Sequence, residues 1–191
     1  MTAPGQDAVV QALQRVLAAQ HAAVFGYPVI GVELRDPGQA RLARLLEARH
    51  RHTRDELMAQ LAARRASPAP AEASYTPAQP VTAPADAQRW ALELEQDCAA
   101  AYRYLLVAPV LAAATGQKPS GATGSNATGS NATGSNGSNG SNGSGGPALT
   151  AAAHASLRRQ ALAGLNTAAL NATEWRSLLS PATPTVAFPG L

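Results

Sequence analysis

Four separate segments of this chain carry apolar residues at every third or fourth position, and this spacing constrains the fold more than any other feature. In the first segment the stripe consists of Leu13, Leu17, Gln20, Val24, Tyr27 and Gly31. Residues at this spacing lie on one face of an α-helix. Hydrophobic residues make up 46% of the chain but aromatic residues only 4%, so alanine and leucine, the best helix formers, dominate the apolar content. The sequence therefore predicts an all-α protein.

The boundaries of four helices follow from the ends of these stripes. We expect helices over residues of about 7–34, 37–65, 84–115 and 147–178. Asp36 can cap the second helix, because Pro37 suits the first helical position and Gln39 stands three residues after the cap. With so short a turn before it, the second helix should pair with the first as an antiparallel hairpin.

The connection between the second and third helices is rich in proline. Residues 66–83 contain four prolines and should be extended. A stretch of this length in the polyproline conformation reaches roughly 55 Å, whereas a helix like the first is only about 42 Å long. This connection can therefore cross the whole length of a helical bundle.

Low complexity marks a second long connection. Residues 116–146 are rich in glycine, serine and asparagine, cannot bury apolar surface, and are expected to be a disordered linker. Residues 181–191 form a short C-terminal tail. The chain is therefore expected to be a single domain, 1–191, that carries this linker inside it.

Four motifs occur in a fixed order along the chain. They are Gln20-His21-Ala22-Ala23-Val24-Phe25-Gly26-Tyr27, His50-Arg51-x-x-Arg54-Asp55-x-Leu57, Tyr75-x-Pro77-x-x-Pro80-Val81-Thr82 and Phe188-Pro189-Gly190. In this order and spacing they resemble an actinobacterial ferritin-like family described only as a domain of unknown function. The resemblance implies a ferritin-like antiparallel four-helix bundle with a crossing connection between its second and third helices. It brings no established activity, since a fold does not fix a function.

A ferritin-like fold raises the question of a metal site. Di-iron members place one glutamate on each of two helices and a Glu-x-x-His motif on each of the other two. Glu47 and His50 match that motif in residues and spacing. Counting outward from the turn places Gln20 and His21 level with them, and the third expected helix offers Glu95. These residues should converge near the centre of the bundle.

Two departures argue against a complete di-iron centre. Gln20 stands where the family motif has a glutamate, and the fourth expected helix has no Glu-x-x-His, because its only histidine, His154, follows Ala151 at that spacing. A smaller site for iron or manganese would use Glu47, His50, Glu95 and His21.

A buried hydrogen-bond network left by a lost metal site is the alternative that we favour. Its members would be Gln20, His21, Glu47, His50, Glu95 and Tyr102. Such a network must be satisfied internally and helps to fix the register of the helices.

Other function classes are less well supported. The second helix carries seven arginines against three acidic residues, but they circle the helix without interleaved aromatic residues, so a solvated face is expected and nucleic acid is not. No apolar run is long enough to cross a membrane, and no secretory signal is visible. The single cysteine, Cys98, permits no internal disulfide.

We therefore expect a cytoplasmic, bacterial helical bundle that acts by binding or by self-association, with a dimer as the expected assembly. No catalytic residue and no cofactor is assigned. The alternative function is an iron- or manganese-binding protein, with oxidase activity as one form of it, at Glu47, His50 and Glu95.

Overall fold

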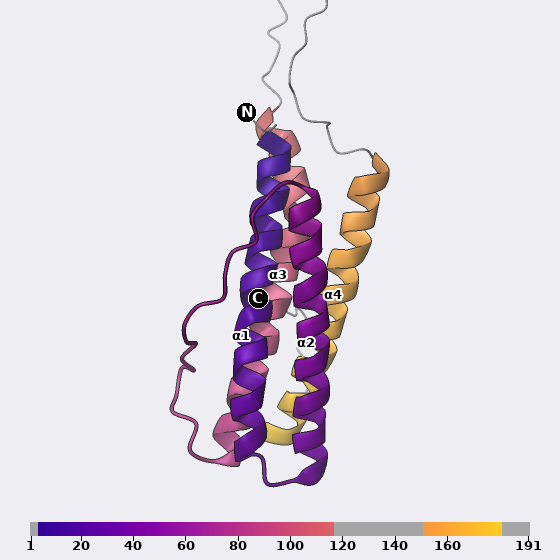
Figure 1. Ribbon diagram of the computed structural model, residues 1–191. Helices are drawn as coiled ribbons and strands as arrows, with labels where there is room; N and C mark the ends of the chain where they lie inside the picture. Colours follow the sequence, from indigo (N-terminus) through magenta and orange to yellow (C-terminus); the bar gives the residue numbers. More distant parts are fainter. Residues whose placement is uncertain (1–3, 117–150, 181–191) are drawn as a thin grey trace, which may run out of the picture.

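The protein is all-α. The computed structural model describes residues 4–116 and 151–180, and side chains within 8–108 and 151–180. Its helices are α1 (Pro4–Glu33), α2 (Pro37–Ala63), α3 (Pro84–Gly116) and α4 (Ala151–Leu179), and these described residues include no strand (Figure 1). The predicted class and the four helices are confirmed, and the predicted linker beyond Gly116 and the tail from 181 lie outside the described residues.

The helix boundaries follow local chemistry. α2 begins at Pro37, and the Asp36 side chain accepts a hydrogen bond from the Gln39 backbone N–H at 2.9 Å, as the capping pattern predicts. α2 ends where Arg65 takes a left-handed conformation with φ 57°. α1 continues through Pro28 to Glu33. The expected start of the fourth helix at 147 falls outside the described residues, and its described part begins at Ala151.

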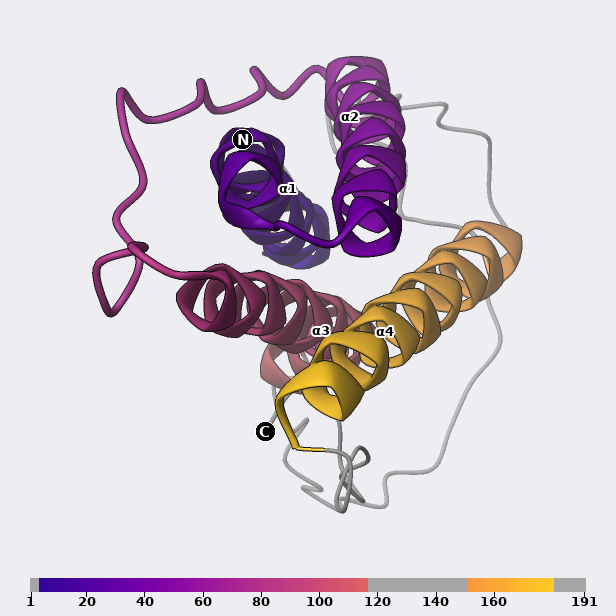
Figure 2. The same ribbon diagram turned by 90° about the horizontal axis from the view of Figure 1, so that it is seen from below.

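The helix backbones approach one another closely on three sides of the bundle. α1 packs against α2 and α3, and α3 packs against α4. Within the described chain, no Cα atom of α2 comes within 8 Å of a Cα atom of α4. Viewed along the helices, α2 and α4 stand apart on the side away from the long connection (Figure 2). On this fourth side the two backbones are therefore more widely separated than those of the helix pairs that pack directly.

The connection between α2 and α3 runs along the outside of α1 from one end of the bundle to the other (Figure 1). Gln14 of α1 holds its first part: the amide donates to the Ser67 carbonyl at 2.7 Å and accepts from the Ala69 N–H at 2.9 Å. Further along, the rings of Phe25 and Tyr75 lie 5.5 Å apart.

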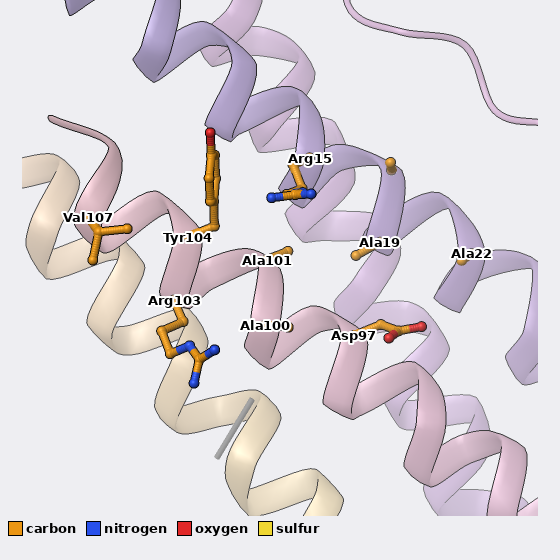
Figure 3. Close-up of a pocket in the computed structure, with 10 residues that line it drawn as sticks. Arg15, Ala19, Ala22, Asp97, Ala100, Ala101, Arg103, Tyr104 and Val107 are labelled. Carbon is orange, nitrogen blue, oxygen red and sulfur yellow. The ribbon is translucent and has the colours of Figure 1, made fainter. Parts of the chain in front are cut away.

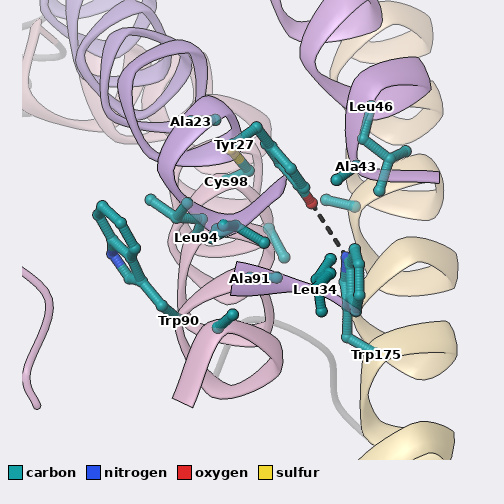
Figure 4. Close-up of a cluster of buried hydrophobic side chains, with 14 residues drawn as sticks. Ala23, Tyr27, Leu34, Ala43, Leu46, Trp90, Ala91, Leu94, Cys98 and Trp175 are labelled. Atoms are coloured by element: carbon teal, nitrogen blue, oxygen red, sulfur yellow. Dashed lines mark hydrogen bonds between the residues drawn. The ribbon is translucent and has the colours of Figure 1, made fainter. Parts of the chain in front are cut away.

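The buried side chains form two apolar clusters. One surrounds Tyr27, Trp90 and Trp175 near the α1–α2 turn (Figure 4). The other surrounds Leu13, Leu57 and Tyr102 toward the opposite end. The buried polar side chains are Gln20, His21, His50, Glu95 and Asn171. Because Gln20 follows the α1 residues of one cluster and precedes those of the other, polar groups lie where the clusters meet.

None of the described helices combines the length and apolarity that crossing a membrane requires.

A glycine sets how closely α4 approaches α3. A Cβ atom added at Gly164 would lie 2.3 Å from the ring of Tyr102, while one added at Gly31 would meet only the Ala43 Cβ, at 3.9 Å. We expect Gly164→Ala to lower the free energy of unfolding by about 1–3 kcal/mol, because ring and backbone must separate. Gly31→Ala is the matched control and should raise it by up to about 1 kcal/mol through helix propensity. Urea unfolding measures both, and equal behaviour of the two variants would contradict the close α3–α4 contact.

Candidate ligand site between α2 and α4

A fully buried carboxylate lies at the centre of the bundle. Glu95 of α3 is 0% exposed. Its Oε1 accepts a hydrogen bond from the Tyr27 hydroxyl at 2.6 Å and lies 3.0 Å from His50 Nε2. Its Oε2 is buried and has no hydrogen-bond partner among the residues that the structure describes. A buried carboxylate oxygen without a hydrogen bond lowers the stability of the folded state. A hydrogen-bond donor at Oε2 would therefore stabilise this site.

His50 joins the carboxylate to α1. Its Nδ1 forms a hydrogen bond to Gln20 Oε1 at 2.8 Å, and the Gln20 amide donates to Cys98 Sγ at 3.6 Å. Burial, followed by the nearby charge of Glu95, raises the pKa of the Cys98 thiol well above its usual value. The thiol is therefore protonated at neutral pH and serves as a buried neutral partner.

Tyr27 supports Glu95 from the other side. Trp175 of α4 donates from Nε1 to the Tyr27 hydroxyl at 3.1 Å (Figure 4), and the Tyr27 ring stacks on His50 with centroids 5.3 Å apart. Burial first, and then the charge of Glu95, raise the pKa of Tyr27. The Tyr27 hydroxyl therefore keeps its proton and donates a hydrogen bond to Glu95.

A cavity of about 230 Å³ adjoins this cluster. It lies on the side where no Cα atoms of α2 and α4 in the described chain come within 8 Å of each other. It is lined by Gln20, Arg49, His50, Thr53, Glu56, Glu95, Cys98, Tyr102, Gln160, Ala163, Gly164, Thr167, Ala168 and Asn171. All four helices contribute to it. A buried carboxylate with one unsatisfied oxygen therefore belongs to the lining of a cavity large enough for a small molecule.

Only part of the predicted metal site comes together. His50 and Glu95 are in contact, Gln20 adjoins them, and Tyr102 lines the same cavity. Glu47 instead pairs with Arg51 one turn further along α2, and His21 lies 3.3 Å from the Ala69 carbonyl in the connection.

Within the described part of the chain, no three His, Cys, Asp or Glu side chains are placed to hold one metal ion. His154 of α4 does not line the cavity. Tyr27 and Trp175 also belong to the cluster, although sequence reasoning does not propose them as site residues. Tyr27 lies on the first apolar stripe, and such a position does not distinguish a core ring from a hydrogen-bond donor.

A second hollow lies between α1 and α3 (Figure 3). It has a volume of about 690 Å³ and a floor of alanines, with Arg15 and Arg103 toward one end and Asp97 toward the other. The Arg15 guanidinium stacks over the Tyr104 ring, 4.5 Å from its centroid. Among the described residues that line it, none has a buried polar side-chain atom lacking a partner. The cavity at Glu95 is therefore the stronger candidate for a ligand site.

Known proteins resemble this chain without supplying an activity. Residues 12–123 match a family model described as a domain of unknown function (DUF4439). The chain is also similar to the crystal structure of a conserved hypothetical protein, rv2844, from Mycobacterium tuberculosis, with 27% identity and a TM-score of 0.65. That similarity covers 97% of this chain and 99% of the other. No curated protein matches the chain.

The buried thiol predicts how stability depends on alkaline pH. The unfolded thiol ionises near its ordinary pKa of 9.0, while the folded pKa of Cys98 is raised. The contribution of the neutral Cys98 thiol to the free energy of unfolding is therefore complete below about pH 9. As the pH rises further, this contribution falls by up to about 1.4 kcal/mol per pH unit. Chemical unfolding between about pH 8.5 and 10 measures this slope. Cys98→Ser should flatten it, and an unchanged slope in that variant would contradict the assignment.

Proposed function

The chain belongs to the family of domains of unknown function DUF4439, and we propose that it binds a small organic cation in the cavity between α2 and α4. The observation that carries this proposal is the Glu95 Oε2 atom, which is buried and has no partner among the described residues, in a side chain that belongs to the lining of that cavity. A protonated amine would donate a charge-assisted hydrogen bond to it, which is stronger than a hydrogen bond between neutral groups.

The surroundings of Oε2 favour a cation over an anion. The pKa of Tyr102 is raised by burial and then by negative groups that include Glu56 and Glu95. The Tyr102 ring also offers an aromatic face to a cation entering the cavity. Arg49 is the basic side chain of the lining other than His50, and it is exposed to solvent.

Binding is favoured over catalysis by the state of the reactive groups. Cys98, Tyr27 and Tyr102 are the thiol and hydroxyls nearest to Glu95, and burial raises the pKa of each of them. Raised pKa values keep these groups protonated, which suits hydrogen bonding and not nucleophilic attack.

Iron or manganese remains the second candidate ligand. The unpaired Glu95 Oε2 with His50 beside it would supply a carboxylate and an imidazole, which both cations accept. Glu47 and His21, which the sequence also proposed as ligands, would have to leave Arg51 and the Ala69 carbonyl to join them.

Replacing the carboxylate by its amide tests the function. We expect n-butylamine to bind the wild-type protein in titration calorimetry, and Glu95→Gln to weaken that binding at least about tenfold, because one charge-assisted hydrogen bond is lost. Circular dichroism of the variant without amine would check that it still folds, because the amide keeps one acceptor oxygen for the Tyr27 hydroxyl. Glu93→Gln, on the same helix but outside the cavity lining, is the matched control. Manganese binding lost in Glu95→Gln, with no amine binding to the wild type, would favour the second candidate.

We also propose that the four helices form a ferritin-like bundle that pairs with a second copy, in keeping with the cytoplasmic location predicted from the sequence. The long connection from α2 to α3 supports the ferritin-like arrangement (Figure 1). The groove between α1 and α3 supports the pairing, because its arginines and Asp97 lie toward opposite ends. Two copies related by a twofold axis through the groove would each place an acidic end on a basic end.

A charge exchange tests the pairing. We expect the wild type to be a dimer in sedimentation velocity, and Arg103→Asp and Asp97→Arg each to weaken it by placing like charges together. The double variant Arg103→Asp/Asp97→Arg should restore it. Arg41→Asp, an exposed site on α2, is the control for net charge. A monomeric wild type, or a dimer that neither single variant weakens, would contradict this interface.

A further inference from the structure

The cavity has a second carboxylate at its solvent side. Glu56 of α2 lines the same cavity as Glu95, and its side chain is 55% exposed beside His52. Glu95 is fully buried at the inner end. On the basis of the proposed cation binding, we infer that the natural ligand is a short linear diamine, with one ammonium group on Glu95 Oε2 and the other at Glu56.

The spacing of the two acids fits such a molecule. Glu95 contacts His50, and Glu56 stands six residues further along α2. At 1.5 Å per residue, the two levels are separated by about 9 Å along the helix axis. Each ammonium group donates across about 2.8 Å to its carboxylate. Taken in line, the remaining span between the two nitrogen atoms is about 3–4 Å, which suits a chain of about two or three methylene groups.

The wall between the two acids suits an alkyl chain. Tyr102 belongs to the cavity lining together with both acids. Gly164, Ala163 and Ala168 of α4 line the same stretch without large polar side chains. The Tyr102 ring lies directly over Gly164, where a Cβ atom would sit 2.3 Å from it, so a smooth surface of ring and backbone faces the chain.

The polar ends of the cavity match the two charged ends of a diamine. By their helix positions, Thr53 of α2 stands midway between the levels of the two acids, Gln160 of α4 stands toward the Glu56 end, and Asn171 stands near the Glu95 end. Hydroxyl and amide oxygens can accept the remaining ammonium protons. A ligand that spans Glu56 and Glu95 would also tie α2 to α3 across the open side of the bundle.

A series of amines of increasing length tests the inference. Titration calorimetry would compare n-butylamine with linear diamines of two, four, six and eight carbons on the full chain. We expect the best diamine to bind about tenfold or more tightly than n-butylamine, because it makes a second charge-assisted hydrogen bond. The tightest binding is expected at the short end of the series, at two to four carbons, since a longer chain must fold to place both ammonium groups on the acids. Equal affinity for the monoamine and every diamine would overturn the diamine and leave the proposed cation site standing.

Two variants identify the second contact. Glu56→Gln should lower the affinity for the best diamine to that for n-butylamine and leave n-butylamine binding unchanged. Glu47→Gln removes the same charge from α2 outside the cavity lining and should change neither affinity. Glu95→Gln should weaken both amines. If Glu56→Gln and Glu47→Gln act alike, Glu56 is not the second contact and the inference fails. If no amine binds the wild type, the proposed function fails with it.

Discussion

The burial of the Glu95 carboxylate is the constraint on which the centre of this bundle depends. A charge removed from water must be compensated by hydrogen bonds and opposite charge. Tyr27 of α1 and His50 of α2 both reach Oε1, and Trp175 of α4 holds the Tyr27 hydroxyl. One carboxylate on α3 therefore fixes the relative positions of all four helices at this level. Its second oxygen has no hydrogen-bond partner in the described part of the chain.

The opening beside Glu95 follows from how α4 packs. The absence of a side chain at Gly164 lets α4 lie directly on Tyr102 of α3, and Trp175 reaches across to Tyr27 of α1. These contacts hold α4 against α3 and α1. In the described chain, no Cα atom of α4 lies within 8 Å of a Cα atom of α2. The same packing that makes the α3–α4 contact tight thus leaves a space opposite α2, where polar side chains of both helices line the cavity.

Sequence reasoning identifies the elements well because the helical period and the cap are local. It also places Gln20, His50 and Glu95 at one level, since counting outward from a short turn fixes depth in a hairpin. Sequence reasoning does not determine in which direction around the helix axis a side chain points. Glu47 shares a helix face with Arg51 four residues on and forms an ion pair there. Trp175 and Tyr27 are 148 residues apart, and no local pattern indicates that they meet.

Gln20 determines which kind of ligand the site can hold. The family motif that the sequence resembles has a glutamate at this position, and a second carboxylate beside Glu95 would favour a divalent cation or a pair of them. Gln20 is neutral, bonds to His50 through its oxygen and donates to Cys98 through its nitrogen. Gln20 thus forms hydrogen bonds with both neighbours without adding a charge to the site. The one oxygen of Glu95 that lacks a partner among the described residues then requires a hydrogen-bond donor, and the ammonium group proposed for the site is such a donor.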